Sequence, residues 1–111
     1  MASPRTMPTI NATDCDTTNS ALAFMHQRWM PAVLDAASRG ARRAIEYRRM
    51  IDGISDRMLH VRLKELEAHK LIRREVVPSM PVQVFYDITD RGRSLVEAMR
   101  GVTRWAERAD G

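Results

Sequence analysis

The side chains best suited to binding another molecule lie in the middle of the chain, and most of them are arginine. Residues 42–74 hold ten Lys and Arg residues against five Asp and Glu residues, a net charge of +5, whereas the whole 111-residue chain carries +4. Arginine presents a planar fork that donates paired hydrogen bonds to phosphate or to guanine. Such a segment is typical of proteins that bind nucleic acid. The alternatives are an ordinary solvated surface and a GC-rich genome, which favours arginine codons over lysine codons.

Residues 56–69 within this segment have the periodicity of an amphipathic helix. Leu59, Leu63 and Leu66 fall on one apolar stripe, and Ser55 precedes them as a candidate N-cap. A helix that buries leucine and exposes basic side chains is suited to insertion into a DNA groove. The residues expected to contact bases or backbone from this helix are Ser55, Arg57, His60, Val61 and Lys64.

Each of these side chains has a natural partner in DNA. Arg57 can bond O6 and N7 of guanine, and Val61 can contact the methyl group of thymine. His60 can bond a base or a phosphate, while Ser55 can reach a phosphate at the helix N-terminus. Arg62 lies on the flank of the apolar stripe, where phosphate contact and a structural salt bridge are equal alternatives.

Three helices are predicted before the amphipathic helix. The first follows the capping pair Asn19-Ser20, and the second starts near Pro31 and ends at Gly40. The third covers residues 45–51, with Ile45 and either Met50 or Ile51 turned inward. Arg42 and Arg43 lie beside the third helix and are further candidates for contact with the DNA backbone.

A β-hairpin and a last helix are predicted after residue 70. Residues 71–77 and 82–88 alternate in polarity around a proline-containing turn. The candidate DNA-contacting residues of this hairpin are Arg73, Arg74, Ser79, Met80 and Gln83. Thr89 caps the last helix. The apolar residues expected to form a dimer interface, or to line an effector pocket, are Phe24, Met25, Trp29, Met99, Val102 and Trp105.

The elements together predict a mainly helical fold with a small β-hairpin, which is a winged helix-turn-helix. Asp52-Gly53-Ile54 is the predicted turn between the third and fourth helices. The fourth helix would enter the major groove, and the hairpin would follow the adjacent backbone or minor groove. We expect residues 1–17 to be a flexible arm and residues 18–111 to form the winged domain, with dimerisation helices at both ends.

Four segments carry a resemblance to a known family. They are Arg28-Trp29, GISDRMLHVRLKELEAHKLIRREV at 53–76, Pro81 with VFYDITDRG at 84–92, and residues 95–105. In combination they resemble the HxlR-type branch of the MarR-like bacterial transcriptional regulators. The resemblance implies a homodimeric DNA-binding regulator that pairs through its first and last helices. It also implies, as in several members, a cysteine before the first helix that senses oxidants or electrophiles.

The chain departs from the family pattern at three places. His26 and Gln27 stand where members commonly have two small residues, often glycines. Cys15 is followed by aspartate and lies 14 residues before Trp29, whereas the family's cysteine is often followed by proline and lies 13 before. Gln83 replaces a wing arginine that is common in the family. These departures concern the dimer end, the redox site and the wing contact, respectively.

The single cysteine, Cys15, has two interpretations. As a possible redox sensor it would form an intersubunit disulfide, a sulfenic acid or a mixed disulfide. A helix N-terminus favours the reactive thiolate, but Asp14 and Asp16 oppose it with negative charge. The alternative is a chance thiol on a mobile arm.

Several function classes lack their sequence signatures. No CxxC, HExxH, GxGxxG or Walker-type loop is present, and no nucleophile–base pair or catalytic carboxylate pair is identified. His26, His60 and His69 do not have the spacing of a metal cluster. We therefore expect no enzyme activity, no cofactor and no metal. No apolar run of membrane-spanning length and no secretory leader occurs, so we expect a cytoplasmic protein without a membrane partner.

The sequence thus predicts a sequence-specific DNA-binding regulator, in its simplest form a homodimeric repressor. Its expected partners are double-stranded DNA, a second copy of the chain, and an oxidant, electrophile or small-molecule effector. The rival prediction is a protein-interaction module that uses a winged helix as a docking platform, because a fold alone does not decide its use.

Overall fold

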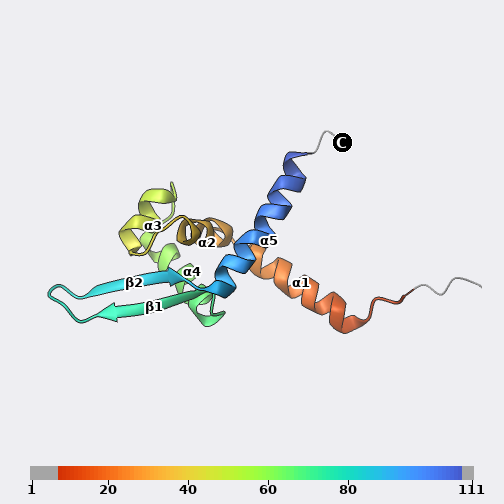
Figure 1. Ribbon diagram of the computed structural model, residues 1–111, viewed down its shortest axis with the longest axis horizontal. Helices are drawn as coiled ribbons and strands as arrows, with labels where there is room; N and C mark the ends of the chain where they lie inside the picture. The colour runs from red at the N-terminus through yellow and green to blue at the C-terminus, as the bar shows by residue number, and fades with distance from the viewer. Residues whose placement is uncertain (1–7, 109–111) are drawn as a thin grey trace, which may run out of the picture.

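The chain folds into short helices that lead into a projecting β-hairpin and end in a long helix (Figure 1). The computed structural model describes residues 8–108. Its elements are α1 (Ala12–His26), α2 (Met30–Ser38), α3 (Ala44–Met50), α4 (Asp56–Ala68), β1 (Ile72–Val77), β2 (Gln83–Ile88) and α5 (Asp90–Glu107). The predicted winged helix-turn-helix is confirmed. No helix within the described residues has the length and apolar character needed to cross a bilayer.

The core forms around α2, which packs against α4, β2 and α5. Val33 and Leu34 of α2 are fully buried. The predicted leucine stripe of α4, Leu59, Leu63 and Leu66, is buried as well. Each buried leucine contributes ~1.5–3 kcal/mol relative to exposure. This burial fixes the rotation of α4 about its axis and so determines which of its side chains face solvent.

Side-chain caps and one glycine set the limits of α4 and α5. The Ser55 hydroxyl accepts a hydrogen bond from the backbone N–H of Met58 at 3.1 Å, and Thr89 caps α5 through the N–H of Gly92 at 3.1 Å. Gly53 has a φ of +88°, a left-handed conformation that glycine adopts without the steric cost of a Cβ atom. Both predicted caps and the predicted turn are therefore confirmed.

The first helix starts earlier than predicted. Asn11 is its N-cap, and its side chain accepts a hydrogen bond from the N–H of Asp14 at 2.8 Å. The predicted start after Asn19-Ser20 was wrong, and residues 12–17 of the predicted arm are helical. The polar composition of this segment provides no apolar stripe, so helical periodicity was not visible there. Residues 1–7 of that arm lie outside the described residues.

Of the residues predicted to turn inward from the third helix, Ile51 is buried and Ile45 is not, while Tyr47, which was not predicted, is also buried. Ile45 is 47% exposed, whereas Tyr47 is fully buried. The Tyr47 hydroxyl donates a hydrogen bond to the carbonyl oxygen of Tyr86 at 2.7 Å, which compensates for burying a polar group. Burial also raises the pKa of Tyr47. The partner lies 39 residues away in the sequence, so only the tertiary structure could identify it.

The hairpin projects on one side of the molecule, and α1 and α5 extend on the other (Figure 1). β1 and β2 pair antiparallel, from Ile72 opposite Ile88 to Val77 opposite Gln83. Tyr86 is buried on the face of the hairpin that meets the core, and its N–H also bonds the carbonyl of Arg42. The base of the hairpin is therefore attached to the domain, while its tip reaches beyond it.

A close approach at Gly92 gives a direct test of this packing. A Cβ atom there would collide with the carbonyl oxygen of Leu71 and lie 2.7 Å from Cγ1 of Ile88. We expect Gly92→Ala to lower the free energy of unfolding by about 1–3 kcal/mol, because α5 must move away from the hairpin. Urea denaturation followed by circular dichroism measures this change.

Gly101 supplies the matched control in the same helix. A Cβ atom at Gly101 meets only the Arg104 guanidinium, at 3.9 Å. Gly101→Ala is expected to raise stability by about 0.5–1 kcal/mol, since alanine is the better helix former. Equal stability changes for the two variants would contradict the packing described here.

Candidate nucleic-acid interface

The exposed face of α4 holds the residues that the sequence predicted as DNA readers. Arg57, His60, Val61 and Lys64 are all exposed, opposite the buried leucines of the same helix. Ser55 is exposed at the start of the helix. The structure therefore brings the five predicted residues of this helix together on one accessible surface, which we call the α4 face.

Hydrogen bonding within α4 orients His60. Its Nδ1 lies 2.9 Å from the backbone carbonyl oxygen of Asp56, one turn earlier in the helix. A hydrogen on Nδ1 satisfies that carbonyl and leaves Nε2 as an acceptor in the neutral ring. An acceptor at this position is complementary to the amino group of adenine or cytosine in the major groove.

Arg62 does not belong to the α4 face. Its Nε donates to the carbonyl oxygen of Arg28 at 2.7 Å. Its Nη1 lies 3.0 Å from Oε1 of Gln27 and 2.8 Å from Oε2 of Glu65. Only 13% of the side chain is exposed. Of the two alternative roles predicted for Arg62, the structure shows the contacts of the structural one, and these contacts hold the guanidinium away from the α4 face.

Arg42 is held by the hairpin. Its guanidinium bonds both carboxylate oxygens of Asp87, at 2.6 and 3.2 Å, and lies over the ring of Phe85 at 4.7 Å. The hydrogen bond from Arg42 lowers the pKa of Asp87, with a smaller contribution from the charge of Arg73. This ion pair offsets the charge of Arg42, so Arg42 is a weaker candidate for phosphate contact than the sequence indicated.

Arg43 begins α3 and is exposed. Oε1 of Glu46 accepts hydrogen bonds from the backbone N–H groups of Arg43, at 2.7 Å, and Arg42, at 3.0 Å. These two bonds lower the pKa of Glu46. The Arg43 side chain is exposed and remains a candidate for phosphate contact.

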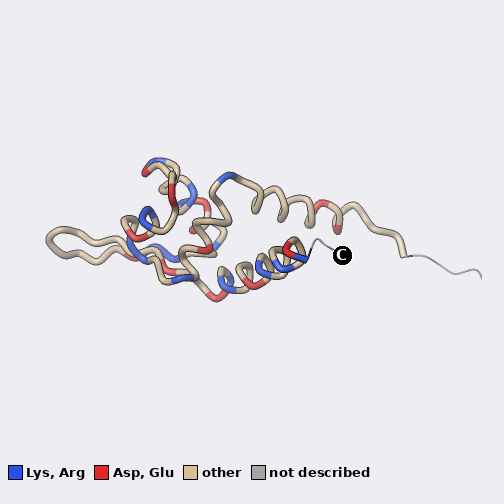
Figure 2. The backbone as a smooth tube through the Cα atoms, turned by 90° about the horizontal axis from the view of Figure 1, so that it is seen from above, with Lys and Arg blue, Asp and Glu red and all other residues tan. Residues whose placement is uncertain are grey.

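The cations of the wing lie at its base. Arg73 pairs with Asp87 and Arg74 with Tyr86 in the β-ladder, so the two arginines point to opposite faces. Residues 76–84, which form the outer part of the hairpin, carry no charged side chain. Figure 2 shows this uncharged tip, on which Met80 is fully exposed.

Two predicted polar contacts of the wing are less accessible than expected. The Ser79 hydroxyl donates to the carbonyl oxygen of Pro81 at 2.8 Å and stabilises the loop. Gln83 is half-buried opposite Val77. The accessible cations of the wing are therefore Arg73 and Arg74 at its base, both of which are exposed.

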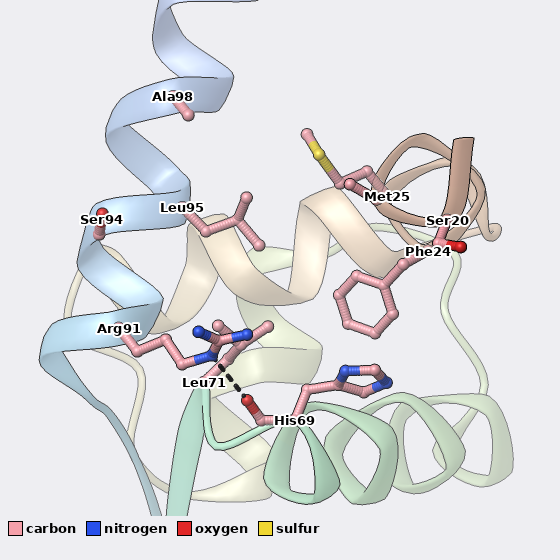
Figure 3. Close-up of a pocket in the computed structure, with 10 residues that line it drawn as sticks. Ser20, Phe24, Met25, His69, Leu71, Arg91, Ser94, Leu95 and Ala98 are labelled. Carbon is pink, nitrogen blue, oxygen red and sulfur yellow. Dashed lines mark hydrogen bonds between the residues drawn. The ribbon is translucent and has the colours of Figure 1, made fainter. Parts of the chain in front are cut away.

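A groove lies between α1 and α5, beside the end of α4 (Figure 3). It measures about 530 Å³, and Phe24, Met25 and Leu95 form its apolar part. The ring of His69 lies 4.2 Å from that of Phe24, and Nε of Arg91 donates to the His69 carbonyl at 3.1 Å. The groove is thus apolar on one side and carries hydrogen-bonding groups on the other.

The six predicted interface residues do not form one cluster. Phe24, Met25 and Met99 surround a common space beside α2. Val102 and Trp105 lie further along α5 and are 60% and 77% exposed. Trp29 lies apart from both groups, at the junction of α1 and α2, with the Arg28 guanidinium 5.1 Å from its ring centroid. Periodicity shows which residues share one face of a helix but not what packs against that face, so it could not separate these environments.

Cys15 is exposed in α1 and is not part of an arm. Its Sγ lies 3.6 Å from Nδ2 of Asn19, one turn later. Within the described residues, no group of three or more His, Cys, Asp or Glu side chains could hold a metal ion.

Comparison with known proteins agrees with this architecture. Residues 24–110 match the sequence profile of the family described as HxlR-like helix-turn-helix. The chain is 34% identical over 95 residues to the HTH-type transcriptional regulator YodB of Bacillus subtilis (strain 168), covering 86% of this chain and 85% of YodB.

Solved structures show the same similarity. The reduced form of YodB from B. subtilis matches with a TM-score of 0.76 and 30% identity, over 90% of this chain and 94% of that one. A regulator from Enterococcus faecalis V583 assigned to the MarR family matches with a TM-score of 0.79 and 29% identity, over 96% and 94%. The redox regulator HypR in its reduced form matches with a TM-score of 0.74 and 30% identity, over 83% and 91%.

Proposed function

The chain belongs to the HxlR-like helix-turn-helix family of transcriptional regulators, and from that premise we propose that it is a homodimeric repressor that recognises a specific DNA sequence. The observation that carries this proposal is the α4 face, which presents Arg57, His60, Val61 and Lys64 while three buried leucines hold the helix in place. This is a binding function and not a catalytic one. A protein with this function works in the compartment that holds the DNA, which in bacteria is the cytoplasm.

Two classes of contact support recognition. Arg57, His60 and Val61 have the chemistry to read base edges in the major groove. Lys64 and Arg43 can contact phosphates, as can Arg74 at the base of the wing, and such contacts raise affinity without selecting a sequence. The uncharged wing tip would contact the adjacent minor groove mainly through shape.

The exposed apolar side chains of the terminal helices support a dimer. All residues of α1 are described by the structure, and none of their side chains is buried in the single chain. Leu22 on α1 and both Val102 and Trp105 on α5 are exposed. A second copy would cover such surfaces and direct two α4 faces at successive major grooves, about 10–11 base pairs apart.

The proposal is tested by fluorescence anisotropy with duplex DNA from upstream of the chain's own reading frame. If the protein does not bind that DNA, an operator is first selected from a pool of random duplexes and used instead. A regulator should prefer its site over a scrambled duplex by roughly 10³ or more, and its affinity should fall steeply with salt. Equal, weak binding to every duplex would favour the protein-interaction module.

Arg57 is the base-reading residue whose loss should be most informative. Arg57→Ala is expected to weaken specific binding by about 1–3 kcal/mol and to relax the preference for guanine at one position. Lys64→Ala should weaken specific and scrambled duplexes alike and lower the salt slope by about one. Arg93→Ala, an exposed arginine on α5, is the control for loss of charge. An unchanged affinity for Arg57→Ala would remove this residue from the reading set.

Trp105 tests the dimer. Trp105→Glu places a charge in the proposed interface and is expected to weaken dimerisation by about 2 kcal/mol or more, which is roughly 30-fold or more in the dissociation constant. Analytical ultracentrifugation measures the change. Because Trp105 is 77% exposed in the single chain, the monomer should remain folded. Arg100→Ala on another face of α5 is the control, and an equal effect of both variants would contradict the assigned interface.

Two relatives support control by oxidants. YodB has been solved reduced, diamide-treated and quinone-bound, and HypR is described as a redox regulator. This chain has one cysteine, the exposed Cys15. A peroxide would oxidise its thiol to a sulfenic acid with release of water, and condensation with a second thiol would give a disulfide. A small apolar effector in the groove between α1 and α5 is the alternative.

Cys15→Ser separates these possibilities. We expect hydrogen peroxide to change the DNA affinity of the parent protein by about tenfold, a coupling of ordinary size, and to leave Cys15→Ser unaffected. Mass spectrometry of the treated protein identifies the oxidised product. An identical response in both proteins would show that Cys15 is not the sensor.

A further inference from the structure

Arg62 connects α4 to the end of α1. Its guanidinium bonds the Arg28 carbonyl at 2.7 Å and the Gln27 side chain at 3.0 Å, both at the junction between α1 and α2. Glu65, on α4 itself, holds the same guanidinium from the other side at 2.8 Å. With 13% of its side chain exposed, Arg62 forms a charge-assisted connection that water screens weakly.

A second contact joins the same two helices. The Phe24 ring on α1 packs against the His69 ring, which follows the last turn of α4, with a centroid distance of 4.2 Å (Figure 3). His69 lies seven residues after Arg62, about two helical turns or ~10 Å along the helix. One contact would leave a hinge, whereas two contacts at separate points fix an angle between the helices.

The junction itself supports this arrangement. Trp29 has a φ of +71°, an uncommon conformation for a bulky residue. Its ring lies beside Gly53 in the helix-turn-helix turn, where Cη2 is 3.6 Å from the position of an added Cβ atom. The junction between α1 and α2 is thus in contact with the turn that precedes α4, through Trp29, and with α4 itself, through Gln27 and Arg28.

We propose that Arg62 is a positioning residue that, through Gln27 and Arg28, fixes the angle between α1 and the α4 face. In the proposed dimer α1 belongs to the subunit interface, so this connection would set the separation of the two α4 faces and hence the half-site spacing that the protein accepts. This consequence for DNA rests on the proposed function, whereas the fixed angle does not.

The angle is measured with two spin labels. Cys15, the single cysteine, provides the site on α1, and Glu67→Cys provides an exposed site on α4. Double electron–electron resonance then gives the distribution of distances between the labels. Dilution with excess unlabelled protein suppresses distances between subunits. We expect a narrow distribution in the labelled parent and a broadened or shifted one after Arg62→Met.

Variants of Gln27 protect the test against a folding defect in Arg62→Met. Gln27→Met removes the hydrogen-bond acceptor at similar size and should broaden the distribution. Gln27→Glu keeps an acceptor for Nη1 and should retain the narrow distribution. Melting temperatures are measured in parallel. A merely structural role would lower the melting temperature and leave the distribution unchanged, and that result would overturn the proposal.

DNA binding gives the second readout. The parent is titrated on operators whose half-sites are moved apart or together by one base pair. We expect its preference for the natural spacing to fall about fivefold or more in Gln27→Met and to return in Gln27→Glu. A uniform loss at every spacing would contradict the positioning role. If the parent recognises no operator, the proposed function fails, and the label distances still decide the role of Arg62.

Discussion

The burial of one leucine stripe is the constraint on which the rest of the structure depends. Leu59, Leu63 and Leu66 are removed from water against the core around α2, and this fixes α4 in rotation. Because a helix that buries one face must expose the other, Arg57 and Lys64 are directed outward by the same burial that stabilises the fold. No further interaction is therefore needed to direct the side chains of the α4 face toward solvent.

The arginines have two different uses that composition could not distinguish. Arg42 and Arg62 are bound by the hairpin and by the α1–α2 junction, where they join segments distant in sequence. Arg57 and Arg74 are exposed on α4 and on the hairpin, where no side chain among the described residues bonds their guanidinium groups. A count of cations overestimates the number of arginines available for binding, because arginines that bond to other parts of the chain, such as Arg42 and Arg62, are less available to a partner.

The proposed DNA-binding surface and the proposed dimer interface lie on different sides of the core. The α4 face and hairpin form the first, whereas α1 and α5 extend from the other side of the core (Figure 1). The connection between them is short, because the end of α1 contacts α4 through Arg62 and His69. If the proposed function holds, a change in α1, such as oxidation at Cys15, would reach the α4 face through these contacts. Control of DNA affinity then needs only a change of relative orientation.

The sequence by itself determined the elements whose patterns are local. The leucine stripe, the Ser55 and Thr89 caps, the Gly53 turn and the alternating strands were all predicted, because spacing and capping act within a few residues. The tertiary structure alone decided the burial of Tyr47, the ion pair of Arg42 with Asp87 and the internal role of Arg62. It also showed that α1 starts at Ala12, which the sequence pattern did not indicate because α1 has no buried face. The physical reason is distance along the chain, since partners 34 to 45 residues apart meet only after the core has formed.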